Sequence, residues 1–393
     1  MVTTTQISHD VASLKDETIA LRRELHQIPE LSFEEKQTSD IMAKRMESLG
    51  LTVMRGIAST GVVAILKGGK PGKTLLVRTD MDGLPMEETP SRPYGAKLEK
   101  RNHACGHDMN MAIVAQTAKI LSKHKQDIAG SVAFLFQPAD EPQLGARKMM
   151  SEGLYEKVKW DMVLSHHPVP SYNAGQVVVN HGQLWSSSDV LTIKIQGKGA
   201  QAAMRENAID CAPVVAQLIN ALYTLVHNES PANETVMFNI GVVKGGERAA
   251  AILSQAELGI RLAVYSEPLR KKLLARIEEV TKAVCAAGRT TCTLESTQSI
   301  PTITNDASIA ATVHSVAASV VGEKNVITDY RTIFSNDTGV YMEKTPGFMF
   351  MLGIRNEARG ITADWHTPGF DIDEDTLGLG VEIMSRSALE LLK

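Results

Sequence analysis

Short apolar runs that are typical of buried strands alternate with stretches of helical periodicity along the first half of the chain. The strand-like runs cover residues 62–66, 75–77, 132–136 and 162–164, and the helical patterns cover residues 11–28 and 109–121. Alternation of this kind predicts an α/β layered core. The same texture resumes after Pro301, with an apolar strand over residues 348–352.

The segment Ser32-Phe33-Glu34-Glu35 has the spacing of a helix-capping box, in which Ser is followed three residues later by Glu. In such a box the two side chains satisfy free backbone N–H groups at the start of a helix. We therefore expect Ser32 to cap a helix that reaches toward Leu49.

The texture of the chain changes from about Ser187. Strands are expected around residues 189–195, 236–243 and 256–264, and helices over residues 210–225 and 269–284. Helices packed against an alternating sheet make a compact α+β unit. A chain of 393 residues is also long enough for more than one core. We predict an α/β domain over residues 1–186 and 299–393, interrupted by an inserted α+β domain over residues 187–298.

The composition and net charge of the chain limit the classes of binding partner and the cellular compartment that we expect. The formal net charge of −4 argues against the basic face that nucleic acids or anionic membranes require, so we expect neither as a partner. The four cysteines are too few and too scattered for a disulfide framework, which favours a reducing compartment. No signal peptide is visible, and no apolar stretch approaches the roughly 20 residues of a membrane span. We expect a cytoplasmic protein.

The stretch Asn102-His103-Ala104-Cys105-Gly106-His107-Asp108 places a thiol and two imidazoles next to a glycine that permits a tight turn. Cys and His are favoured ligands for zinc-, manganese- or cobalt-type ions. The same stretch is also compatible with a buried structural Cys beside two surface histidines. Whether the chain supplies further ligands and a base decides between these interpretations.

Three polar clusters, at residues 78–82, 137–141 and 165–167, each directly follow a strand-like run. Functional sites in open α/β sheets form at the carboxyl ends of strands, so these clusters could converge in one crevice. There, Asp140 and Glu141 could divide the roles of base and metal ligand. The alternative for this pair is a solvated acidic turn. His167 and His366 could likewise belong to a polar loop and to an interface.

Short motifs are spread over nearly the whole chain: Arg22–Ser32, Thr60–Ala64, Arg78–Pro85, His103–Asp108, Phe136–Glu141, Gly197–Gly199 and His366–Asp371. Together they resemble the metallo-aminoacylase family of amidohydrolases and carboxypeptidases. The most similar branch contains hippurate hydrolases, N-acyl-amino-acid amidohydrolases and auxin-conjugate hydrolases. The resemblance implies a layered α/β metallohydrolase domain, an inserted lid or dimerisation domain, and a homodimer or higher homo-oligomer.

The resemblance also implies two divalent transition-metal ions, manganese or zinc, although the ligand types suit cobalt or nickel as well. The implied ligands are Cys105, His107, Glu141, His167 and His366, with the thiolate shared between the metals. His167 is preferred over His166 because the family pattern places a Pro three residues and a Gly eight residues after its ligand. Pro170 and Gly175 match that spacing from His167.

The chain departs from the family pattern at several positions. The family's general base is Glu, whereas Asp140 stands there, which pulls the carboxylate back by more than about 1 Å. Met109-Asn110-Met111 replaces the usual Gly-His-Thr, Gln201 replaces a substrate-binding His of the inserted domain, and Asn336 replaces a Glu. We assign substrate contacts to Met109, Asn110, Gln201, Asn336 and Asp80.

These features predict a metal-dependent hydrolase of a small molecule in which Asp140 is the base and a C–N bond is cleaved. The expected substrate is the amide of an N-acyl amino acid or a related small amide. One alternative is hydrolytic deamination of a small aromatic amine, in a pocket lined by Met109, Met111, Met349 and Met351. Another is a catalytically degenerate homologue that binds a metal or ligand.

Overall fold

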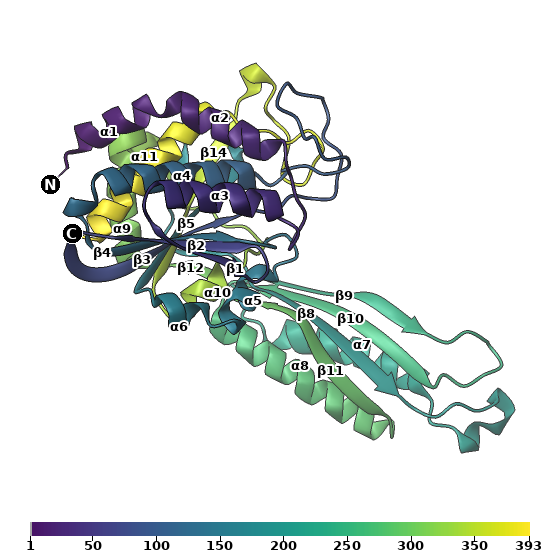
Figure 1. Cartoon of the computed structure of the whole chain (residues 1–393). Coiled ribbons are helices and arrows are strands. Elements are labelled where there is room, and N and C mark those ends of the chain that lie inside the picture. Colours follow the sequence, from purple (N-terminus) through teal and green to yellow (C-terminus); the bar gives the residue numbers. More distant parts are fainter. Residues whose placement is uncertain (1) are drawn as a thin grey trace. The chain divides into compact units, whose positions relative to one another are not determined.

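The computed structural model describes residues 2–393, and the contacts within this part of the chain divide it into two compact units (Figure 1). Unit 1 extends to Leu184 and resumes over Thr304–Tyr330 and Asp337–Lys393, whereas unit 2 comprises Trp185–Ile303 and Arg331–Asn336. Residues 187–298, the predicted insertion, all fall in unit 2. The predicted fold class, an α/β domain interrupted by an α+β domain, is confirmed.

Unit 1 is built on an eight-stranded sheet with the order β1-β2-β4-β3-β5-β14-β6-β13. Its central neighbours β4, β3, β5 and β14 run parallel, whereas β1 and β2 extend it in antiparallel pairing. The strands are β1 (Thr52–Ile57), β2 (Gly61–Lys67), β3 (Lys70–Asp80), β4 (Ala129–Gln137), β5 (Met162–Asn173), β6 (Val177–Val178), β13 (Val326–Ile327) and β14 (Gly347–Arg355). Two further short strands, β7 (Gly182–Trp185) and β12 (Ile303–Asn305), pair with each other.

Helices cover both faces of this sheet (Figure 1), which explains why its central strands are buried over most of their length. The α-helices are α1 (Thr4–Ser13), α2 (Lys15–His26), α3 (Lys36–Ser48), α4 (His107–Lys123), α5 (Gly145–Ser151), α6 (Leu154–Val158), α9 (Ala307–Val321), α10 (Gly339–Met342) and α11 (Asp375–Leu391). Short 3-10 turns are η1 (Lys125–Asp127), η3 (Glu323–Asn325) and η4 (Glu357–Arg359). Helix α4 contacts α2 and α11 as well as β3, so it is buried over most of its length.

Two expectations for the N-terminal region are wrong. The pattern over residues 11–28 belongs to two helices, α1 and α2, which meet at Leu14. Ser32 does not cap α3, because its hydroxyl donates to Asp82 Oδ2 at 2.6 Å, and α3 begins only at Lys36. The first turn of α3 is instead satisfied by Glu30, whose carboxylate accepts two of its backbone N–H groups at 3.1 and 2.9 Å. Ser32 thus bonds to Asp82, which is 50 residues away, and not to the start of the helix that follows it.

Unit 2 is an antiparallel sheet with the order β11-β8-β10-β9 and two long helices. Its elements are β8 (Ser188–Gln196), η2 (Ala202–Asn207), α7 (Cys211–Glu229), β9 (Val236–Gly245), β10 (Gln255–Val264), α8 (Glu267–Ala287) and β11 (Thr291–Ile300). Strand β8 alternates between inward residues such as Ile193 and outward ones such as Lys194. The inward residues join the apolar faces of both helices in one core.

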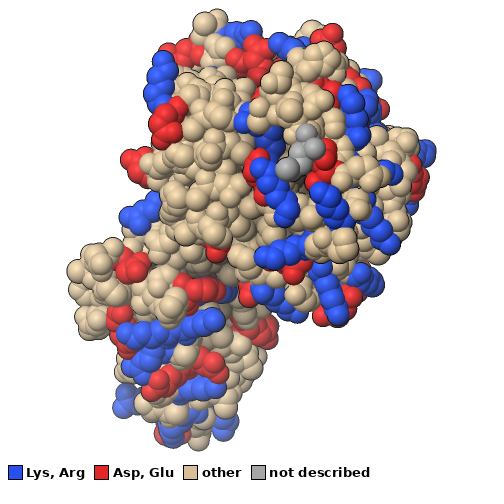
Figure 2. Space-filling view, turned by 90° about the vertical axis from the view of Figure 1, so that its left-hand side faces the viewer, with Lys and Arg blue, Asp and Glu red and all other residues tan. Residues whose placement is uncertain are grey.

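On the face shown in Figure 2, lysine and arginine side chains are interspersed with aspartate and glutamate. Within residues 2–393, no helix is both long enough and apolar enough to cross a membrane.

A buried ion pair joins the start of β8 to the start of α8 in unit 2. Asp189 is 1% exposed and Arg270 is 5% exposed. The guanidinium donates from Nε and Nη2 to the two carboxylate oxygens, both at 2.7 Å. Such a pair is costly to break, because the remaining charge stays buried.

We therefore expect Asp189→Ala to lower the free energy of unfolding by about 3 kcal/mol. The matched control, Lys194→Ala, breaks the exposed Lys194–Glu295 pair and is expected to change it by at most about 0.5 kcal/mol. Urea denaturation followed by circular dichroism measures both. Equal effects of the two substitutions would contradict this account.

Candidate metal centre

Four separate parts of unit 1 carry the predicted ligands. Cys105 lies just before α4, and His107 is the first residue of that helix. Glu141 follows the end of β4, His167 lies within β5, and His366 lies in the segment between β14 and α11. Because β4, β3 and β5 are parallel neighbours, the segments that follow them leave the sheet at the same edge.

Gly106, between the two ligands of the Cys-Gly-His motif, is required by its backbone geometry. Its φ of 83° lies in the left-handed region, which residues with a Cβ atom rarely adopt. A Cβ atom at this position would also lie 2.7 Å from Pro168 Cγ. The glycine therefore lets the chain turn sharply into α4 while remaining close to β5.

Backbone carbonyl groups orient two of the histidines. His107 Nδ1 is 2.8 Å from the carbonyl oxygen of Asp82, and His167 Nδ1 is 2.9 Å from that of Pro168. Because a carbonyl only accepts hydrogen bonds, each Nδ1 carries a proton, and Nε2 is the ring nitrogen that can serve as a ligand. Histidine ligands of metals are typically fixed in this way.

The donor atoms of the predicted ligands form two groups that share one sulfur atom. One group is Cys105, His107 and His167, and the other is Cys105, Glu141 and His366, with the donor atoms of each group within 4.8 Å of one another. Cys105 Sγ is 3.6 Å from His167 Nε2, and Glu141 Oε2 is 3.3 Å from His366 Nε2. A sulfur atom common to both groups is the arrangement expected of a ligand that bridges two ions.

The chemistry of these residues fits a pair of divalent ions. Two buried donor atoms, His107 Nε2 and Glu141 Oε1, have no hydrogen-bond partner anywhere in residues 2–393. Buried polar atoms are rarely left without a hydrogen-bond partner, so both atoms are suited to bind an ion. The mixture of thiol, imidazole and carboxylate suits zinc, manganese, cobalt or nickel.

The electrostatics of the site agree with this fit. Burial raises the pKa of the Cys105 thiol well above its usual range and raises that of Glu141 to about 8. Burial lowers the pKa of His167 to about 4. It opposes protonation of His107 too, but Asp80 and Cys105 outweigh it and raise the pKa of that imidazole. Acidic groups crowded together in this way release their protons readily only beside positive charge, which a divalent ion supplies.

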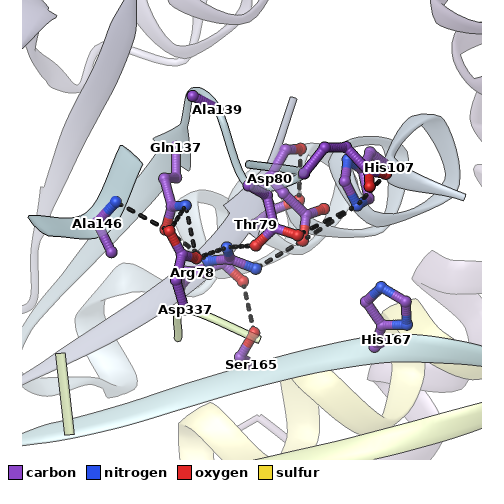
Figure 3. Close-up of polar contacts among 12 residues, drawn as sticks. Arg78, Thr79, Asp80, His107, Gln137, Ala139, Ala146, Ser165, His167 and Asp337 are labelled. Carbon is purple, nitrogen blue, oxygen red and sulfur yellow. Dashed lines mark hydrogen bonds and ion pairs between the residues drawn. The ribbon is translucent and has the colours of Figure 1, made fainter. Parts of the chain in front are cut away.

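Asp140, the predicted base, is held by a fully buried arginine. Arg78 Nη2 donates to Asp140 Oδ1 and, at 2.9 Å, to Asp337 Oδ1, while Nη1 donates to Asp80 Oδ2 at 2.6 Å. Figure 3 shows Arg78 between Asp80 on one side and Gln137 and Asp337 on the other. Burial opposes ionisation of Asp140, but the charge of Arg78 outweighs it and lowers the pKa of this carboxyl.

The second carboxylate oxygen of Asp140 faces the ligand cluster. Its Oδ2 atom is 3.6 Å from His107 Nε2. Asp80, His107 and Asp140 form a third group of donor atoms within 4.8 Å of one another. Asp140 is therefore anchored by one oxygen and directed toward the ligands by the other.

The residues predicted to contact substrate are distributed differently. Asp80 is fully buried and accepts from Asn110 Nδ2 at 2.9 Å. Met109 and Asn110 are also fully buried, so neither presents surface to a substrate in this structure. In unit 2, Gln201 is exposed and its Oε1 accepts from the backbone N–H of Ala203, whereas Asn336 is buried.

The neighbour of His167 has a different environment. His166 is buried and its ring stacks on Phe350, with 5.6 Å between the ring centroids. It belongs to none of the three donor groups formed by residues 2–393. Trp365, which precedes His366, packs edge-to-face on His167 at 5.8 Å.

Reasoning from the sequence assigned no specific role in the site to three residues that organise it: Arg78, Asp82 and Glu35. Asp82 accepts from the backbone N–H groups of Asp140 and Glu141 at 3.0 and 3.1 Å. Glu35 accepts from that of Ala139 at 2.9 Å. The only signal in the sequence was the position of Arg78 and Asp82 in a polar cluster directly after a strand.

Replacement of Gly106 tests how closely the centre depends on this turn. We expect Gly106→Ala to lose metal affinity by about tenfold or more, since the new Cβ must displace Pro168 beside His167. Gly182→Ala is the matched control, because Gly182 has a φ of 78° and a Cβ atom there would meet no neighbouring atom within 4 Å. Equilibrium competition with a chromophoric chelator measures both affinities. A Gly106→Ala protein that binds metal as tightly as the control would contradict this assignment.

Comparison with known proteins agrees with the geometry. The profile of peptidase family M20/M25/M40 matches residues 76–390. Thermostable carboxypeptidase 2 of Saccharolobus solfataricus is 30% identical over 379 residues, which cover 95% of each chain. N-acetylcysteine deacetylase of Bacillus subtilis is 29% identical over 376 residues, covering 95% of this chain and 97% of the relative.

A solved structure shows the same likeness. The crystal structure of the Bacillus subtilis YXEP protein, described as a dinuclear metal binding peptidase from the M20 family, matches with a TM-score of 0.81 at 27% identity. The match covers 97% of this chain and 99% of that one. The predicted relationship to amidohydrolases and carboxypeptidases is confirmed. The chain belongs to peptidase family M20/M25/M40 and is a metal-dependent hydrolase that acts on C–N bonds.

Proposed function

We propose that this hydrolase cleaves the amide bond of an N-acyl amino acid or a related small amide, with two divalent metal ions at the centre. The observation that carries the proposal is the pair of donor groups that share Cys105, next to the anchored carboxylate of Asp140. The relative named N-acetylcysteine deacetylase supports the substrate class, because its name describes hydrolysis of an N-acyl amino acid.

In this proposal the five ligands divide between two ions. Cys105, His107 and His167 hold one ion, and Cys105, Glu141 and His366 hold the other. When bound, such ions lower the pKa of water, polarise the amide carbonyl and stabilise the negative charge that develops on its oxygen. Manganese and zinc are the ions that we propose, within a ligand set that also suits cobalt and nickel.

Asp140 moves the proton in this scheme. Its Oδ2 atom takes a proton from the attacking water as the water oxygen bonds to the carbonyl carbon. When the C–N bond breaks, the same carboxyl returns that proton to the leaving amine nitrogen. Arg78 keeps the carboxylate ionised and fixes its direction through Oδ1. Anchoring of this kind reduces the freedom of a base that is one methylene shorter than Glu.

Several other expectations stay proposals. We propose that Gln201 and Asn336 in unit 2 contact the substrate, that unit 2 acts as a lid or dimerisation domain, and that the protein is a cytoplasmic homodimer or higher homo-oligomer. No observation favours deamination of an aromatic amine. Met109, Met111, Met349 and Met351, which suggested an aromatic pocket, are fully buried in the core of unit 1.

The role of Asp140 predicts a selective loss of turnover. We expect Asp140→Asn to lower kcat by about 10² to 10⁴, because an amide cannot accept the proton of the attacking water. The metal content should stay that of the wild-type protein, since Asp140 is assigned to neither donor group that holds the ions. Steady-state kinetics together with elemental analysis check both parts. Wild-type turnover by a metal-loaded Asp140→Asn protein would exclude Asp140 as the base.

The substrate class is tested with a panel of N-acyl amino acids and substituted aminoaromatic compounds. We expect amide hydrolysis that a chelator abolishes and that added manganese or zinc restores, because all of the rate depends on the bound ions. Release of ammonia from the aminoaromatic compounds without amide cleavage would overturn the proposed substrate. A purified protein with no metal and no activity after metal addition would overturn the proposed function.

A further inference from the structure

The loop that follows β4 has an unfavourable backbone conformation at Ala139, directly before the proposed base and a proposed ligand. Ala139 has a φ of 52°, in the left-handed region that favours glycine. The next two residues are Asp140 and Glu141, the proposed base and a proposed ligand. A change of φ at Ala139 would turn both carboxylates away from the other ligands. The surrounding structure must therefore hold this conformation.

Two buried carboxylates hold it through three consecutive backbone N–H groups. Glu35 Oε1 accepts from Ala139 at 2.9 Å. Asp82 accepts from Asp140 at Oδ1, at 3.0 Å, and from Glu141 at Oδ2, at 3.1 Å. Successive N–H groups that converge on anionic oxygens form an arrangement that binds anions well. The orientation of the loop thus depends on side chains from other parts of the chain.

Glu35 is itself firmly fixed. It is fully buried, its Oε2 accepts from the Thr60 hydroxyl at 2.5 Å, and its Oε1 also accepts from the backbone N–H of Phe33 at 2.9 Å. Glu35 forms none of its described hydrogen bonds with a proposed ligand or with the base side chain. Asp82 differs, because its backbone carbonyl also orients His107. Of these two carboxylates, only Glu35 holds the loop without also orienting a proposed ligand, so a substitution of Glu35 tests the loop alone.

We infer that Glu35 is a positioning residue for the metal centre: it holds Ala139 in the left-handed conformation that directs the carboxylates of Asp140 and Glu141. The inference rests on the proposed function, because it takes Glu141 as a ligand and Asp140 as the base. Glu35 has no part in the reaction itself. Its contribution is the length and direction of its carboxyl group.

Two conservative substitutions of Glu35 distinguish the effect of its side-chain length from the effect of its charge. Glu35→Asp keeps the charge but withdraws the carboxylate by one methylene, so it cannot serve Thr60 and Ala139 together. Glu35→Gln keeps the reach, and its amide oxygen still accepts from Ala139. We expect Glu35→Asp to weaken affinity for manganese or zinc by about tenfold to hundredfold, and Glu35→Gln to stay within about threefold of the wild-type value. Competition with a chromophoric chelator measures both affinities without turnover.

Glu30 supplies a matched control from the same segment. It is also a buried carboxylate that accepts from two backbone N–H groups, those of Gln37 and Thr38, but it forms no described hydrogen bond with the loop. Glu30→Asp should lower the melting temperature while metal affinity stays within about twofold. At saturating metal, Glu35→Asp should also lower kcat by about tenfold with little change in KM, because Asp140 is misdirected.

A rescue experiment tests the role of Ala139 directly. Glycine adopts a left-handed φ without strain, so Ala139→Gly should restore most of the metal affinity lost in Glu35→Asp. Failure of this rescue, wild-type affinity in Glu35→Asp, or an equal loss in Glu30→Asp would overturn the inference. A wild-type protein that binds no divalent metal would instead overturn the proposed function, and the inference with it.

Discussion

Asp82 connects the two halves of the metal centre. Its carbonyl oxygen orients His107 at the start of α4, and its carboxylate holds the backbone N–H groups of Asp140 and Glu141 beyond β4. A site built from side chains on separate elements needs such contacts, because each donor atom must be held close to its partners for an ion to be bound. Strand β3, which ends two residues before Asp82, delivers this residue to the middle of the site.

A second set of contacts governs the charge of the base. Arg78 is fully buried and is surrounded by Asp80, Asp140 and Asp337. One guanidinium cannot neutralise three carboxylates, and burial together with Asp140 raises the pKa of Asp337 well above its usual range. The charge of the same arginine lowers the pKa of Asp140. The hydrogen bond from Arg78 to Asp140 Oδ1 also gives the shortened base a defined direction.

The sequence predicted much of the fold, because buried strands and the polar clusters that follow them leave local patterns. Parallel strands then bring those clusters to one edge, so convergence of residues 78–82, 137–141 and 165–167 could be expected. The hydrogen bonds that hold the site together could not be predicted, because they join residues that are far apart in the sequence. Arg78 bonds to Gln137 and Asp337, which lie 59 and 259 residues away in the sequence. Ser32 and Glu35 looked like a local cap but bond to Asp82 and Ala139, and no local pattern distinguishes those two outcomes.

The central claim is that Cys105 is shared by two metal sites in one chain. Its most direct test is the metal stoichiometry of the purified protein and of Cys105→Ala, measured by elemental analysis after equilibration with manganese or zinc. The account predicts two ions per chain in the wild-type protein and a weakened hold on both ions in the variant, because both donor groups contain this sulfur. A Cys105→Ala protein that keeps two tightly bound ions would contradict it.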